Sequence, residues 1–188
     1  MDELSTAEFE ALRATIRERG TLRPVLAVAT LGGWAALSLW LGTGAGLPAA
    51  TLVPLVVLYG GFEAVAALHL GVERVGRYLQ VAYERSAHRG PRALWETTAM
   101  AFGRVRGGII VDPLFSVAFL SAVVLNLLPA VGATVQEIVA IAAAHALVAV
   151  RVLRVRHYAT RQREVELARF TELVAPRRSP LGEGDRQQ

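Results

Sequence analysis

The chain has 188 residues and a formal net charge of +4, and 53% of its residues are hydrophobic. Its mean hydropathy is +0.40, and ordinary soluble domains are only roughly 45–50% apolar, so a soluble globular fold is disfavoured. The chain contains no cysteine, which excludes disulfides, thiol redox chemistry and thiolate metal sites.

The twenty basic residues are all arginines, and they are confined to three segments: residues 1–23, 71–112 and 151–188. The two stretches between these segments contain no basic residue and only two acids, Glu63 and Glu137. This positive-inside pattern is typical of an inner (cytoplasmic) membrane protein with an even number of spans and both termini in the cytoplasm. Because the arginines flank apolar stretches and alternate with acids, we expect them to contact anionic lipid of the inner leaflet and not nucleic acid.

The first arginine-rich segment, residues 1–23, predicts a cytoplasmic amphipathic helix over 5–19. Ser5 fits the N-cap of that helix and Glu8 the third position of a capping box. Gly20 is expected to end the helix. The apolar stripe of this helix predicts that it lies on the inner leaflet or packs on the protein's own cytoplasmic parts.

Residues 24–70 predict a first transmembrane hairpin, with spans at about 24–46 and 50–70. Both are long enough for a hydrocarbon core about 30 Å thick, which takes about 20 helical residues to cross. The second span is expected to continue as a cytoplasmic helix to near Ser86, and a loop then completes the segment 71–112.

A second transmembrane hairpin is predicted over residues 113–150, with spans at about 113–128 and 135–150. Asp112 is expected to be the N-cap of its first helix, and Pro113 the first helical residue.

The helical pattern of the last span continues through residues 151–174, and residues 175–188 have the composition of a disordered tail. The sequence therefore predicts an all-α membrane protein. Its expected architecture is a four-helix transmembrane bundle with an N-terminal amphipathic helix and cytoplasmic helical extensions.

Glu63 is the most informative polar residue of the predicted spans. It lies about midway along the second span, about 15 Å from the charged edge at Glu73 and Arg74. Ionisable residues at that depth usually face a protein interior or a water-filled cavity. Two interpretations stay open: an oligomeric proton or ion pathway built around Glu63, or a structural hydrogen bond to a neighbouring helix, with Tyr59, Asn126 or a backbone carbonyl as the partner.

His69 and His145 are expected at similar depth, because each precedes the arginine edge of its own span by five or six residues. Two such histidines on neighbouring helices are able to ligate a b-type haem or to relay protons with Glu63. The simpler interpretation is a pair of structural hydrogen bonds. No cofactor is therefore the first expectation, and a haem- or quinone-linked electron-transfer protein is the alternative.

Two further groups of charged residues are predicted near the cytoplasmic edge. His69, Glu73 and Arg77 stand four residues apart on one helix face, which predicts a polar ladder leading out of the membrane. A basic collar that binds anionic lipid headgroups is predicted below the last span, at Arg151, Arg154 and Arg156.

The sequence contains no phosphate-binding glycine loop and no zinc-protease motif, so no catalytic residue is predicted and an enzyme is disfavoured. Small residues four apart, such as Gly32 with Ala36 and Gly60 with Ala64, favour close packing of helices. They suit packing within the bundle, with a second copy or with another membrane protein. The leading hypothesis is a multi-pass, non-catalytic scaffold, assembly or accessory subunit of a membrane complex.

Overall fold

The computed structural model describes residues 3–44, 47–84, 112–128 and 132–174. Every regular element in these ranges is helical, which confirms the predicted all-α class. The elements are α1 (Glu3–Gly44), the short 3₁₀ helix η1 (Pro48–Thr51), α2 (Leu52–Glu84), α4 (Ser116–Leu125) and α5 (Val135–Val174).

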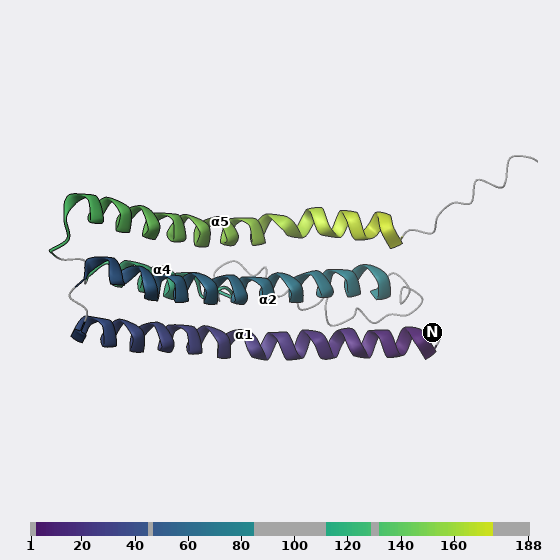
Figure 1. Cartoon of the computed structure of the whole chain (residues 1–188). Helices are drawn as coiled ribbons and strands as arrows, with labels where there is room; N and C mark the ends of the chain where they lie inside the picture. The colour runs from purple at the N-terminus through teal and green to yellow at the C-terminus, as the bar shows by residue number, and fades with distance from the viewer. Residues whose placement is uncertain (1–2, 45–46, 85–111, 129–131, 175–188) are drawn as a thin grey trace, which may run out of the picture.

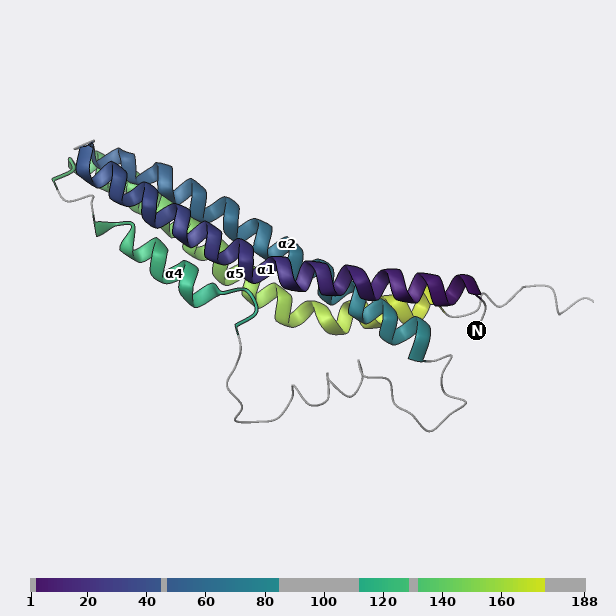
Figure 2. The same cartoon turned by 90° about the horizontal axis from the view of Figure 1, so that it is seen from below.

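The three long helices lie side by side, with α2 between α1 and α5 (Figure 1). α1 runs antiparallel to α2, whereas α2 and α5 run parallel. The start of α1 and the ends of α2 and α5 therefore lie together at one end of the molecule, which we call the arginine-rich end. The opposite end, called here the turn end, holds η1, the end of α4 and the start of α5. Figure 2 shows α4 alongside only the half of the bundle nearest the turn end.

Among the described residues, three helices are long and apolar enough to cross a bilayer, which points to a membrane location. The corresponding helical stretches are Thr6–Gly42, Pro48–Ala82 and Val135–Ala159. α2 continues as one helix past Glu73 and Arg74 to Glu84, and α5 continues past Arg151 to Val174. This agrees with the helical continuation that the pattern of each segment indicates.

Of the predicted third span, 113–128, only Ser116–Leu125 is α-helical, so the described part of the chain has three long apolar helices and one short one where four spans are predicted. This short helix, α4, has ten residues, about 15 Å of a hydrocarbon core about 30 Å thick. A helix this short is typical of a buried or re-entrant segment.

The start of α4 also differs from the prediction. Asp112 does act as a cap, since its carboxylate accepts the backbone N–H groups of Leu114 at 3.2 Å and Val117 at 3.0 Å. The helix begins at Ser116, however, after Phe115 in the left-handed region at φ 52°. Pro113 therefore precedes the helix and is not its first residue.

The prediction that Gly20 ends the first helix is wrong, because α1 continues through both Gly20 and Pro24. A proline ring clashes with the carbonyl four residues earlier, which here belongs to Gly20, and glycine gives the backbone room to adjust at that position. Glu8 and Thr30, on either side of Pro24, both lie against α2. Packing therefore favours one continuous helix over the local stop signals.

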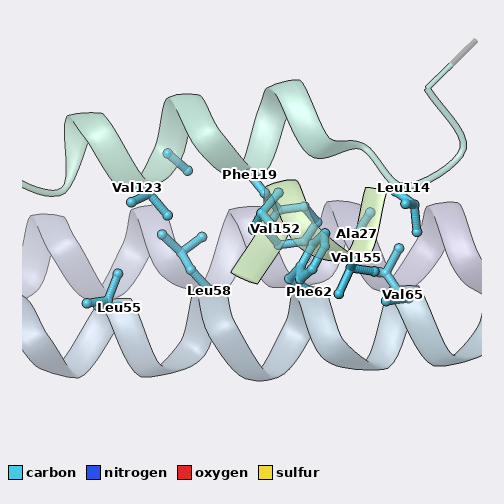
Figure 3. Packing of buried hydrophobic residues seen from close by; sticks show 12 residues of the cluster. Ala27, Leu55, Leu58, Phe62, Val65, Leu114, Phe119, Val123, Val152 and Val155 are labelled. Atoms are coloured by element: carbon cyan, nitrogen blue, oxygen red, sulfur yellow. The ribbon is translucent and has the colours of Figure 1, made fainter. Parts of the chain in front are cut away.

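Aliphatic and aromatic side chains from all four α-helical segments form the core between the turn end and the middle of the bundle (Figure 3). At its centre the rings of Phe62 and Phe119 meet edge to face, with centroids 5.3 Å apart. This contact joins α4 to α2, and Val152 and Val155 join α5 to the same cluster. The short α4 is therefore part of the bundle core.

α1 and α2 pack closely against each other at Gly61. A Cβ atom placed there would overlap the side chain of Thr30. By contrast, a Cβ on Gly32, Gly33 or Gly60 would meet nothing within 4 Å. The small-residue pattern thus marks a real helix contact, but the glycine that makes it is Gly61 and not its neighbour Gly60.

Candidate functional site

At the turn end, a buried network of neutral polar groups connects four elements of the fold. Asn126, only 2% exposed, donates to the carbonyl of Thr51 at 2.8 Å and accepts from Nε1 of Trp34 at 3.0 Å. Its amide nitrogen also lies 2.9 Å from Nε2 of His145. We call Trp34, Thr51, Asn126 and His145 the Asn126 network.

The Asn126 network fixes the tautomer of His145. Nδ1 of His145 lies 2.8 Å from the carbonyl of Ile141, an acceptor only, so Nδ1 carries a proton. Nε2 must then accept from the amide of Asn126, because the Asn126 oxygen is used by Trp34. His145 is thus a neutral imidazole with both ring nitrogens engaged, and it serves as a structural hydrogen-bonding group.

His69 lies in a different layer of the bundle. It is 7% exposed, and its Nδ1 accepts from the guanidinium of Arg23 on α1 at 2.9 Å. This hydrogen bond joins α1 to α2 at the level where the apolar part of α1 begins and the predicted second span on α2 ends.

The predicted equal depth of the two histidines is wrong, and with it the shared haem. The ion pair between Glu63 and Arg151 sets the register of α2 and α5. His145 precedes Arg151 by six residues, toward the turn end, whereas His69 follows Glu63 by six, toward the arginine-rich end. The two imidazoles are separated by about 18 Å along the helix axes, so they cannot be axial ligands of one iron. The prediction was wrong because Arg74 of α2 and Arg151 of α5, from which the depths of the two histidines were counted, lie at different levels along the bundle.

Glu63 pairs with Arg151 in a bidentate geometry, with distances of 2.6 and 2.9 Å. Neither Tyr59 nor Asn126 is its hydrogen-bond partner among the described residues. The pair is partly open to the surroundings, since the side chain of Glu63 is 31% exposed and that of Arg151 is 49% exposed. Arg151 thus brings a positive charge level with Glu63, which places the carboxylate at the charged edge of the bundle and not in an isolated position.

At the arginine-rich end, a cluster of charged groups joins α2 to α5. Arg77 donates to Glu166 at 2.5 Å and to Glu73 at 3.1 Å. Arg74 and Gln162 also donate to Glu166. We call these five residues the Glu166 cluster. The side chain of Arg77 is only 2% exposed and that of Glu166 13% exposed, so this ion pair is largely buried.

The predicted polar ladder is present only in part. Glu73 and Arg77 pair as their spacing indicates, whereas the hydrogen bond of His69 leads to Arg23 on another helix. The spacing along α2 gave no information on Glu166, which lies 89 residues after Arg77 in the sequence.

The predicted lipid collar divides into residues with different surroundings. Arg151 is engaged by Glu63, whereas Arg154 and Arg156 are both exposed on α5. Arg154 lines a groove between α2 and α5, and Arg156 does not. Among the described residues, no group of three or more His, Asp or Glu side chains is arranged to hold a metal ion.

The chain matches no protein-family model, no curated protein and no solved structure.

Proposed function

We propose that this chain is an inner-membrane scaffold or accessory subunit that holds a rigid helical stalk on the cytoplasmic side. The observation that carries the proposal is the buried pair of Arg77 and Glu166, which joins α2 to α5 beyond their apolar portions. A stalk fixed in this way presents a defined surface outside the membrane.

Large apolar side chains are exposed along α5 from Val135 to Leu153, about 27 Å of helix. This length matches a hydrocarbon core of about 30 Å. Leu22 to Trp40 on α1 has a similar series of exposed apolar side chains. Arg23 and Arg151 lie in the last turn of this belt at one end, and the other arginines of the described helices lie beyond that end. By the positive-inside rule this end faces the cytoplasm.

Beyond the belt, α5 continues from Arg154 to Val174, about 30 Å of helix. Tyr78 of α2 links this extension to the other two long helices. Its ring packs on Phe170 of α5 with centroids 5.8 Å apart, and its hydroxyl donates to Glu8 of α1 at 3.1 Å. The three extensions form the stalk, held by the Glu166 cluster and by Tyr78.

The groups that the sequence offers for chemistry are used in structural contacts. His145 and Asn126 complete the Asn126 network, His69 binds Arg23, and Glu63 binds Arg151. A bundle in which these four side chains are engaged in contacts between helices is well suited to hold a surface in position, which favours a scaffold over an electron carrier.

The test is photo-crosslinking in living cells from two exposed stalk positions, Val165 and Leu173, with Leu147 in the apolar belt as the control. The three side chains are similarly exposed, at 69%, 69% and 71%. A scaffold predicts a discrete protein adduct from the stalk positions that is absent from Leu147 and is lost when Arg77→Leu loosens the stalk. Identical adducts from all three positions, or stalk adducts that survive Arg77→Leu, would contradict the proposal.

A further inference from the structure

A groove of about 660 Å³ lies on the side of α5 that faces the end of the apolar portion of α2. We call it the α2–α5 groove. Its apolar wall includes Leu70, Val150 and Leu153, and its polar wall includes Arg154, Tyr158 and Arg161.

The polar wall is a single stripe of α5. Arg151, Arg154, Tyr158 and Arg161 are spaced by three, four and three residues, so they lie on one face of the helix. Arg156 is two residues from Arg154, about 200° around the helix, and therefore points away from the groove.

The positive charge of the groove comes from two of these arginines. Arg151 is neutralised by Glu63. Arg154 and Arg161, by contrast, have no carboxylate partner in the part of the chain that the structure describes. Both are exposed, so the groove presents about two uncompensated positive charges beside an apolar wall.

The order of these groups along the bundle axis matches the order of groups in a phospholipid. Val150 and Leu153 belong to the belt of exposed apolar side chains, where acyl chains lie. Arg154 follows directly, and Arg161 lies about 10 Å farther out. Tyr158, 54% exposed, stands between them with the mixed apolar and polar character that suits the membrane interface.

We propose that the α2–α5 groove binds one anionic phospholipid of the inner leaflet. The anionic phosphate of its headgroup contacts Arg154 and Arg161, and one acyl chain lies along Leu70, Val150 and Leu153. A basic pocket between membrane helices on the cytoplasmic side is a common site for such lipids. The apolar wall favours an intact lipid over a free phosphate, because a free phosphate gains nothing from it.

The experiment is a lipid titration of the detergent-purified full chain, followed by native mass spectrometry. Phosphatidylglycerol is compared with phosphatidylcholine of the same acyl chains. The key variant is Arg154→Gln/Arg161→Gln, and the matched control is Arg17→Gln/Arg156→Gln, which removes two exposed arginines outside the groove.

We expect one phosphatidylglycerol to bind the unaltered chain and the control variant equally well, in preference to phosphatidylcholine. The groove variant should bind it about 30-fold more weakly, since each arginine near an anionic lipid contributes about 1 kcal/mol. Equal weakening in the two double variants would overturn the proposal, as would equal binding of the two lipids.

Two further measurements distinguish a lipid held in the groove from lipid spread over the bundle and from bound phosphate. A phosphatidylglycerol with a photoreactive acyl chain should label peptides containing Val150 or Leu153, and labelling spread evenly over α1 would contradict the groove. Inorganic phosphate should not displace the lipid, and displacement would assign the site to phosphate and refute the lipid proposal.

Thermal melts followed by circular dichroism show whether the groove variant keeps its fold. Both double variants should melt at the temperature of the unaltered chain, because the replaced arginines are exposed. A lower melting temperature confined to the groove variant would contradict a lipid-binding role for Arg154 and Arg161.

Discussion

The two ends of the bundle are held together by different kinds of polar group. At the turn end, the Asn126 network connects α1, η1, α4 and α5 through neutral groups only. At the arginine-rich end, the Glu166 cluster connects α2 and α5 through charged groups. Glu63 and Arg151 lie between the two, as a partly exposed ion pair. The groups that link the helices are thus neutral at the turn end and charged at the arginine-rich end.

This difference follows from the cost of charge in a bilayer. A charged side chain at the centre of a transmembrane helix costs roughly 2.5–3.5 kcal/mol on insertion scales. A neutral hydrogen bond between membrane helices contributes about 0.6 kcal/mol on average. Neutral groups are therefore tolerated within the hydrocarbon, and charged pairs become useful where the helices leave it. Substitutions in the polar groups of the two ends should therefore lower the free energy of unfolding by different amounts.

The strongest destabilisation is expected for Arg77→Leu. This change leaves Glu166 without its buried partner, and breaking a buried ion pair by removing one member costs about 3 kcal/mol. The free energy of unfolding, measured by denaturant titration in detergent, should fall by that amount. Arg74→Leu is the control, since Arg74 is 61% exposed and an exposed pair contributes under about 1 kcal/mol. Equal losses in the two variants would mean that the Arg77 pair has no special structural role.

At the turn end, Asn126→Leu should have the next strongest effect. It leaves three groups without their partner: the indole N–H of Trp34, the carbonyl of Thr51 and Nε2 of His145. Together these lost contacts should cost about 2–3 kcal/mol. In a double-mutant cycle, Trp34→Phe should cost clearly less in the Asn126→Leu background than alone. Additive losses would show that the two side chains do not interact.

A third prediction contrasts two adjacent glycines at the contact of α1 with α2. Gly61→Ala places a methyl group against Thr30 and should lower the free energy of unfolding by about 2 kcal/mol through overpacking. Gly60→Ala meets nothing within 4 Å and should be neutral or slightly stabilising. Thr30→Gly should restore part of the loss in Gly61→Ala. A larger loss at Gly60 than at Gly61 would contradict the helix register.

Glu63→Gln should change stability least. Because both members of its ion pair are partly exposed, the loss should stay under about 1 kcal/mol. Proton flux through liposomes containing the protein should equal that of empty liposomes with and without the change. A flux that depends on Glu63 would support the proton-pathway hypothesis and weaken the scaffold assignment.

The sequence predicted the helical class and the extensions of α2 and α5, because hydropathy and charge report directly on single segments. It also singled out His145, His69 and Glu63 as unusual polar residues, and named Asn126 as a candidate partner of Glu63. Their partners could not be predicted, since each partner comes from another helix and depends on the register between helices. Trp34 looked like an ordinary aromatic residue of an apolar span, and Arg23 like part of a basic flank.

The wrong predictions share one physical origin, the packing between helices. The depth of each histidine was predicted from its distance to the next arginine on the same helix. His69 and His145 were therefore placed at one level, although these arginines lie at different levels on α2 and α5. Gly20 and Pro24 are local stop signals, but the packing of α1 on α2 continues through both. The shortness of α4 depends on the left-handed turn at Phe115, a residue type that does not favour that conformation.

The proposed topology requires that residues 47 and 128 face one side of the membrane and that the end of α5 faces the other. The chain lacks cysteine, so single cysteines report position without background. Leu47→Cys, Leu128→Cys and Leu173→Cys suit the test, because these leucines are 69%, 66% and 69% exposed. With a membrane-impermeant maleimide, the first two should be labelled in intact cells and the third only after lysis. Labelling of position 173 in intact cells, or of 128 only after lysis, would contradict this topology.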